Sequence, residues 1–114
     1  MKTLRPITTI QSFHAHIYYS RENVEEARSF RELVGATFGI PLGHLHERPI
    51  GPHLAWSCQL TIPKERFGEI VPWLALNRGT LDFFIHPETG NDLLDHSEHV
   101  MWLGKSYPLN LSIF

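Results

Sequence analysis

Two histidines, His14 and His16, stand two residues apart in the segment FHAHIYY, which alternates between apolar and polar positions over 13–19. An alternation of period two is typical of a β-strand with two distinct faces, so both imidazoles are expected on the same face. Their Cβ atoms would lie about 6.5–7 Å apart, and side chains can converge from that distance on one metal ion. The spacing therefore favours an imidazole site of the kind that holds zinc or ferrous iron.

Histidine is abundant in the whole chain, with eight residues in 114. Further strands are predicted at 42–47, 53–62 and 81–86 from their alternation and their flanking turn residues. If the bulky apolar residues of each strand face the helices, the remaining residues share the opposite, open face. Six histidines then gather on that face: His14, His16, His44, His46, His53 and His86. The alternative is a solvated polar surface with no ligand.

Two helices are predicted between these strands. Apolar residues recur at spacings of three and four over 24–38, and Gly39 follows as a stop signal. Pro63 opens a second apolar pattern that ends at Gly79 and contains Pro72, which should kink the helix.

The resulting order is strand, helix, strand, strand, helix, strand, which predicts an α+β fold, a ferredoxin-like βαββαβ sandwich with both helices on one face. The expected strand order across the sheet is 81–86, 13–19, 53–62, 42–47. The segment 87–104 is rich in turns, with one helical turn predicted inside it. The alternating tail 108–114 predicts an extra C-terminal edge strand. Because a bare sheet face needs cover, we expect a homodimer through the open face, with the histidines at the interface.

Composition limits the class of protein. We expect one domain over 1–114, with 1–11 as a loose N-terminal arm. A net charge of −2 argues against a nucleic-acid partner, and no apolar run is long enough to span a membrane. Cys58 is the only cysteine, which fits a reducing compartment, and the N-terminus lacks the apolar core of a secretory signal, so we expect a cytoplasmic protein.

Four segments of the chain resemble one known family. They are HAHIYY at 14–19, RPIGPH at 48–53, WLALNRGTLDFFIHPETGNDLLDH at 73–96 and WLGKSYPL at 102–109. Together they resemble the DOPA 4,5-dioxygenase family, a group of small aromatic ring-cleaving dioxygenases with bacterial relatives. The resemblance covers about residues 12–109. It implies a non-haem iron enzyme that inserts both atoms of O₂ into a catechol such as DOPA and breaks the ring beside the two hydroxyls, which is extradiol cleavage.

The family's motif histidines fall on this chain at His14, His16, His53, His86 and His96. The resemblance implies Fe(II) as the cofactor, and another divalent metal such as Zn is an alternative in the isolated protein. We expect His16, His53 and His86 as ligands, with His14 as an alternative. The set His14, His16 and His86 also stays open, because His53 begins one predicted strand while His86 ends another that runs the same way. His14, His46 and His96 are the expected catalytic residues, for proton transfer with the catechol.

Substrate contacts are expected from Arg78 or Arg48, which could bind a carboxylate, and from Tyr18 on the histidine face. No acid stands out as a carboxylate ligand; Asp82, Glu47 and Asp95 are the nearest by sequence. Two rival functions remain. One is a non-catalytic dimeric module that binds a metal or an aromatic ligand, and the other is a metal-dependent hydrolase or isomerase on the same fold.

Overall fold

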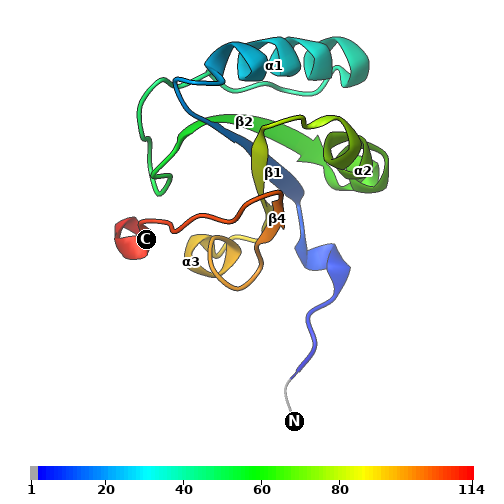
Figure 1. The fold of residues 1–114 in the computed structure, drawn as a ribbon. Helices are drawn as coiled ribbons and strands as arrows, with labels where there is room; N and C mark the ends of the chain where they lie inside the picture. The colour runs from blue at the N-terminus through cyan, green and yellow to red at the C-terminus, as the bar shows by residue number, and fades with distance from the viewer. Residues whose placement is uncertain (1–2) are drawn as a thin grey trace.

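A four-stranded antiparallel sheet and two long helices form the body of the protein, in a computed structural model that describes residues 3–114. Across the sheet the strands lie in the order β2 (Trp56–Pro63), β1 (Ser12–Tyr19), β3 (Asp82–Glu88) and β4 (Met101–Leu103). The helices α1 (Val24–Phe38) and α2 (Phe67–Asn77) cover one face of the sheet (Figure 1). The α+β fold predicted from the sequence is therefore confirmed.

The core lies between the sheet and these two helices, as the alternation predicts. Ala15 and Ile17 of β1 are fully buried there, and Leu60, Ile62, Phe83 and Ile85 line the same side of the neighbouring strands. The apolar stripes of the helices supply Ala27, Phe30, Val34, Ile70 and Leu74. Cys58 also points into this core, and burial raises the pKa of its thiol. Because successive side chains of a strand point to opposite faces, the residues that alternate with these apolar ones point away from the helices.

The prediction of a strand at 42–47 is wrong. The segment does lie where it was expected, along the free edge of β2. It makes a single bridge, between Leu42 and Leu60. Its further hydrogen bonds run from Gly43 N to Gln59 O at 2.6 Å and from His46 N to Ser57 O at 3.1 Å. The donors are three residues apart, so the two-residue repeat of a strand is not kept. Gly43 permits the close approach, since a Cβ there would lie 3.0 Å from Gln59 O.

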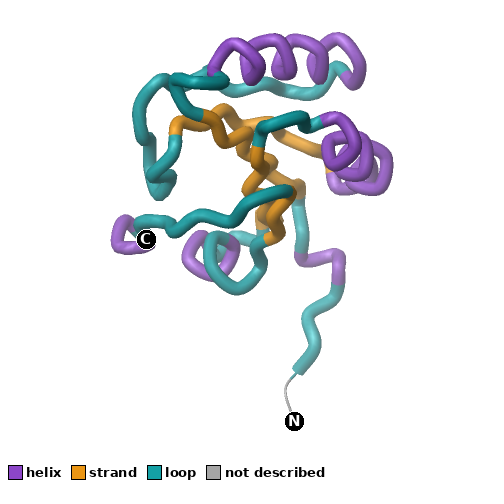
Figure 2. The backbone as a smooth tube through the Cα atoms, viewed as in Figure 1, coloured by secondary structure: helices purple, strands orange, loops and turns teal. Residues whose placement is uncertain are grey.

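The tail strand predicted at 108–114 is also wrong, and the edge strand beside β3 is β4 instead. The tail leaves β4 and runs to the loop at 48–55, as Figure 2 shows. Leu109 forms a bridge with His53, and Asn110 N donates to Pro52 O at 2.9 Å. The chain then ends in the short 3₁₀ turn η3 (Leu111–Ile113). Pro108 has no N–H to donate, which keeps the tail from continuing a ladder.

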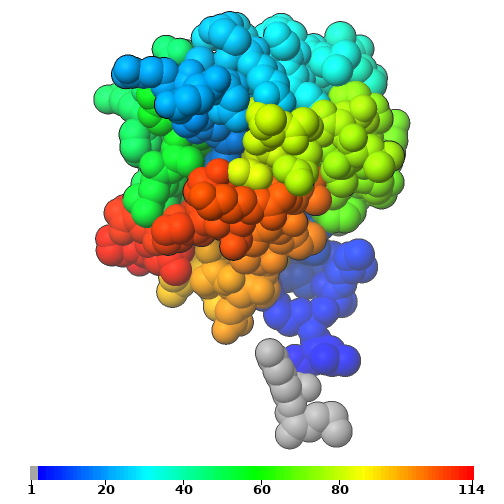
Figure 3. All heavy atoms as spheres, viewed as in Figure 1, coloured from blue at the N-terminus to red at the C-terminus, as the bar shows by residue number. Residues whose placement is uncertain are grey.

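The face opposite α1 and α2 is covered by the same chain, which corrects the expectation of an open sheet face. In Figure 3 the orange and red C-terminal atoms lie below the helices and against the green loop. The short helix α3 (Asp92–Asp95) follows β3 on this side. Phe84 and His86, which point to this face, are fully buried. The homodimer through this face stays a prediction. Within residues 3–114, no helix is both long enough and apolar enough to cross a membrane.

Candidate metal centre

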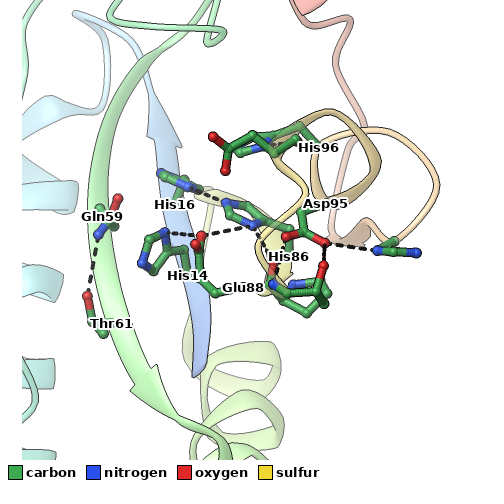
Figure 4. A network of polar contacts seen from close by, with 12 residues as sticks. His14, His16, Gln59, Thr61, His86, Glu88, Asp95 and His96 are labelled. Atoms are coloured by element: carbon green, nitrogen blue, oxygen red, sulfur yellow. Dashed lines mark hydrogen bonds and ion pairs between the residues drawn. The ribbon is translucent and has the colours of Figure 1, made fainter. Parts of the chain in front are cut away.

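The covered face brings together His14, His16 and His86 (Figure 4). The register of the two central strands causes this, because His14 lies directly opposite His86, and His16 follows two residues later on the same face. One ligand atom from each of the three residues lies within 4.8 Å of the other two. Among residues 3–114 this is the one group of histidine, cysteine or acidic side chains with that spacing.

The nitrogen positions fit a shared metal ion. His16 Nε2 and His86 Nε2 are 3.2 Å apart, and His86 Nδ1 lies 3.0 Å from Pro87 O. The carbonyl accepts a hydrogen bond, so the His86 proton belongs on Nδ1 and the lone pair on Nε2. Two nitrogens that bind one ion at about 2.0–2.1 Å in tetrahedral geometry lie about 3.4 Å apart. The pair is therefore spaced as two ligands of one ion would be.

Burial keeps these imidazoles neutral. The pKa of His16 is lowered well below its usual value, and that of His86 is lowered to about 4. In both residues the main cause is desolvation, which disfavours the charged imidazolium. His14 is part-exposed, and its pKa is lowered less strongly by the same cause. Neighbouring imidazoles add to the effect on all three. Neutral imidazole is the form that coordinates a metal, so no proton has to leave near neutral pH.

His53 reaches the same group from a loop. Its ring centroid is 4.3 Å from that of His16, and its Nδ1 lies 2.6 Å from the Tyr18 hydroxyl. The sequence places His53 at the start of a strand, far from His86. In the structure β2 begins only at Trp56, and the loop before it folds back over the sheet. His53 thus approaches His16, but it does not belong to the three-histidine group.

Comparison with known proteins places the chain in a family. The model of the Dopa 4,5-dioxygenase family matches residues 13–113. The chain belongs to the Dopa 4,5-dioxygenase family. A family relative, the DOPA 4,5-dioxygenase of Amanita muscaria, is 35% identical over 112 residues, which cover 90% of this chain and 49% of that protein. The resemblance found in the sequence is therefore confirmed.

Two further relatives agree with membership of the Dopa 4,5-dioxygenase family. An uncharacterized 21.2 kDa protein of Botryotinia fuckeliana is 35% identical over 114 residues, covering 90% of this chain and 62% of that protein. A crystal structure from Nostoc punctiforme, described as a "putative dioxygenase", is 39% identical with a TM-score of 0.92, and covers 95% of this chain and 94% of that one. The chain spans about half to three fifths of the length of the two curated relatives.

A small cavity adjoins the histidines of this dioxygenase-family chain. Its volume is about 220 Å³, and its wall includes His16 and His53. The other lining residues are Gly43, His44, His46, Ile50, Ser57 and Gln59. The predicted catalytic residue His46 thus faces a cavity beside His16. The cavity could hold a small ligand next to the candidate metal ligands.

His96, another motif residue of the dioxygenase family, lies on the other side of His86. Their ring centroids are 4.1 Å apart. His96 Nδ1 lies 2.7 Å from Asp92 O, and its ring stacks on Phe114 at 4.5 Å. The segment after β3 therefore brings a fifth imidazole to the edge of the group, which the sequence resemblance anticipated.

The two arginines predicted to bind substrate lie outside the three-histidine group. Arg78 Nη1 donates to Leu81 O at 2.9 Å and lies 3.5 Å from an Asp82 carboxylate oxygen. Asp82 is four residues before His86 on β3, a separation of about 13 Å along a strand. Arg48 is exposed and lines an outer pocket with His44 and His46. Of the two, only Arg48 is near the cavity beside His16. Tyr18, the third predicted substrate contact, is buried and holds His53.

The acids nearest by sequence have other partners. Asp95 is buried and accepts hydrogen bonds from Thr89 N, Thr89 Oγ1 and His99 Nδ1. Asp82 accepts from the Tyr107 hydroxyl at 2.6 Å and from Lys105 N at 2.9 Å. Glu47 is exposed and pairs with Arg28 at 3.5 Å. These contacts position loops rather than complete the histidine group.

The acid that does reach the group is Glu88, which the sequence pattern did not predict. Its Oε1 lies 2.9 Å from His14 Nδ1 and 3.6 Å from His86 Nδ1. Desolvation is the main cause that raises the pKa of this carboxyl, and Asp95 and Asp92 add to it. A signal was present, since positions 82, 84 and 86 share one face and 88 continues the series. The strand predicted from the sequence ends at His86, and the segment from Pro87 onward is predicted to be rich in turns.

The lowered histidine pKa values predict an acid-sensitive apo protein. The folded pKa values of His53 and His86 are about 4, against 6.5 for the free side chain. Between these values the unfolded chain binds more protons, so the free energy of unfolding should fall as the pH falls. From pH 7 to pH 5 we expect a loss of at least about 1.4 kcal/mol, the equivalent of one pKa unit. Urea unfolding of the metal-free protein at pH 7 and at pH 5 measures this change in the free energy of unfolding. Equal stability at pH 5 and 7 would mean that the imidazoles are hydrated.

Proposed function

We propose that this chain is a metal-dependent dioxygenase that opens the ring of a catechol in the extradiol manner, with Fe(II) held by His14, His16 and His86. The observation that supports the proposal is the group of three imidazoles on one sheet face of a chain from a dioxygenase family. DOPA is the substrate that the name of the Amanita muscaria relative suggests.

The residues fit such a metal in number and in protonation. Three neutral imidazoles leave coordination positions open, as non-haem iron sites of oxygenases do. When bound, ferrous iron supplies positions for a catechol and dioxygen and lowers the pKa of the catechol hydroxyl. The cavity beside His16 gives a small aromatic ring access from the side of His46 and His53.

The chain's own groups then orient the substrate and handle its protons. Burial raises the pKa of Tyr18, so its hydroxyl stays protonated and keeps its 2.6 Å contact with His53 Nδ1. This contact fixes the ring of His53 and leaves Nε2 as its free nitrogen. His46 is less buried and faces the same cavity, where it can accept a catechol proton. Arg48, at the outer pocket, is the group available for an anionic side chain of the substrate.

The proposal predicts oxygen consumption that depends on both iron and a catechol. Protein reconstituted anaerobically with Fe(II) is mixed with a panel of catechols and then with air. We expect one O₂ consumed for each catechol and a yellow ring-fission product, followed with an oxygen electrode and by absorbance. The variant His99→Gln should retain this activity, because His99 contacts Asp95 outside the group. If the protein binds one Fe(II) per chain and no catechol consumes oxygen, the chain is a non-catalytic metal-binding module instead.

A further inference from the structure

Tyr18 and His53 form a buried pair at the edge of the histidine group. The Tyr18 hydroxyl lies 2.6 Å from His53 Nδ1, and the two residues are only 1% and 6% exposed. Among residues 3–114, His53 Nδ1 is the one hydrogen-bond partner of this hydroxyl. The neighbouring ring of Tyr107 offers no alternative, because its own hydroxyl donates to Asp82 at 2.6 Å. The Tyr18 proton therefore has a single acceptor within reach.

The direction of this hydrogen bond decides which nitrogen of His53 carries the proton. Desolvation lowers the pKa of His53 to about 4, so the imidazole is neutral and holds one proton. If that proton were on Nδ1, it would point at the phenol oxygen and the phenol proton would have no acceptor. If the phenol donates to Nδ1, the His53 proton lies on Nε2 and no donor is wasted. A buried donor without an acceptor is costly, which favours the second arrangement.

The length of the contact agrees with a donating phenol. O–H donors stand about 2.5–3.0 Å from an oxygen acceptor, whereas N–H donors stand about 2.7–3.2 Å from theirs. The 2.6 Å between the Tyr18 hydroxyl and His53 Nδ1 falls in the first range only. His86 is the opposite case, since its Nδ1 faces the carbonyl of Pro87 at 3.0 Å and must donate. The two imidazoles thus carry their protons on different nitrogens.

This difference separates His53 from the candidate metal ligands. Coordination needs a nitrogen with a free lone pair, which His86 keeps on Nε2. His53 has none, because Nδ1 accepts from Tyr18 and Nε2 carries the proton. His53 also stands outside the three-histidine group, although its ring centroid is 4.3 Å from that of His16. Its Nε2–H is the polar ring group that remains for the cavity beside His16, whose wall includes His53.

We propose that Tyr18 makes His53 a hydrogen-bond donor, which binds an anionic oxygen of a ligand in this cavity and does not coordinate the metal. The ligand class is a small aromatic with an ionised hydroxyl. A hydrogen bond to an ionised oxygen is roughly twice as strong as one between neutral groups. The inference rests on the proposed metal site, and it removes His53 from the ligand set, which leaves His14 as the third ligand.

Nitrocatechol, a coloured catechol, and Co²⁺ test the two halves of the inference separately. Co²⁺ affinity is measured by competition with a chelator, and nitrocatechol binding to the Co²⁺-loaded proteins by absorbance. We expect His53→Leu to bind Co²⁺ as wild type does but nitrocatechol at least about tenfold more weakly, because a hydrogen bond to a charged group is lost. His53→Gln should retain more nitrocatechol affinity than His53→Leu, since its amide can donate.

Two further variants complete the set. Tyr18→Phe should also weaken nitrocatechol binding without changing Co²⁺ affinity, because it acts on the His53 ring alone. His99→Gln is the matched control, since His99 contacts Asp95 outside the group, and it should match wild type in both measurements. Circular dichroism checks that every variant folds.

The tautomer itself is read from long-range ¹H–¹⁵N correlation spectra of the metal-free wild type at neutral pH. The signals of His53 are assigned by their absence from the His53→Gln spectrum. We expect the proton on Nε2 of His53 and on Nδ1 of His86. A proton on Nδ1 of His53 would overturn the inference.

Three binding results would also overturn it. If His53→Leu loses about 100-fold or more in Co²⁺ affinity, His53 is a ligand, while the metal centre and the proposed function stand. If nitrocatechol binds His53→Leu as tightly as wild type, His53 is not a donor to the ligand. If wild-type protein binds no Co²⁺, the proposed metal site fails and the inference fails with it.

Discussion

Replacement of His16 by alanine is expected to weaken metal binding by more than about 100-fold. Loss of a residue that only hydrogen-bonds to a metal ligand costs up to about 100-fold in affinity, and loss of a ligand itself should cost more. His16 lies at the centre of the group, with its Nε2 3.2 Å from His86 Nε2 and its ring 4.3 Å from the ring of His53. Either of the two ligand sets considered for this chain contains His16. The measurement is the affinity for Fe(II) or Co²⁺, obtained by competition with a chelator.

His99→Gln is the matched control for that experiment. His99 is also a histidine, but its Nδ1 contacts Asp95 at 2.9 Å on the loop after α3. Its variant should bind metal as wild type does. Normal metal binding by His16→Ala would show that the ion sits elsewhere on the protein.

Phe84→Ala should lower the free energy of unfolding by about 3–5 kcal/mol, the usual cost of removing a buried phenylalanine. Phe84 is fully buried although it points away from the helices. Its ring lies 5.7 Å from that of His16, 5.4 Å from that of His86 and 4.9 Å from that of Trp102. The residue therefore belongs to a second apolar layer under the site. Urea unfolding of the metal-free proteins measures the change.

Phe114→Ala makes the same chemical change at the surface, where the residue is 41% exposed. We expect it to cost less than about 1.5 kcal/mol, because little apolar surface returns to water. A similarly small loss for Phe84→Ala would mean that the covered face is loosely packed or open.

Local alternation is enough to predict which side chains share a face of the sheet. In β1 and β3 the period of two extends without interruption, so the sequence alone places His14, His16 and His86 on one side. Their close approach then depends on register, which the antiparallel pairing of β1 with β3 sets and which one sequence does not reveal.

Irregular segments account for what the sequence did not reveal. The loop at 48–55 carries two prolines and a glycine, and the tail begins with Pro108. The two segments pair with each other through His53 and Leu109, a contact that no periodic pattern encodes. These two segments bring His53 next to His16 and cover the sheet face that was expected to be open. Glu88 escaped prediction for a related reason, since a proline such as Pro87 usually ends a strand, whereas β3 continues through it to Glu88.

The central claim is that imidazoles from β1 and β3 bind one metal ion on the covered face of the sheet. Anomalous diffraction at the cobalt absorption edge, from crystals of the Co²⁺-loaded protein, tests it most directly. We predict one strong peak at about 2.1 Å from Nε2 of both His16 and His86. A map with no peak between these two residues, or with its main peak beside His44 and His46, would contradict the account.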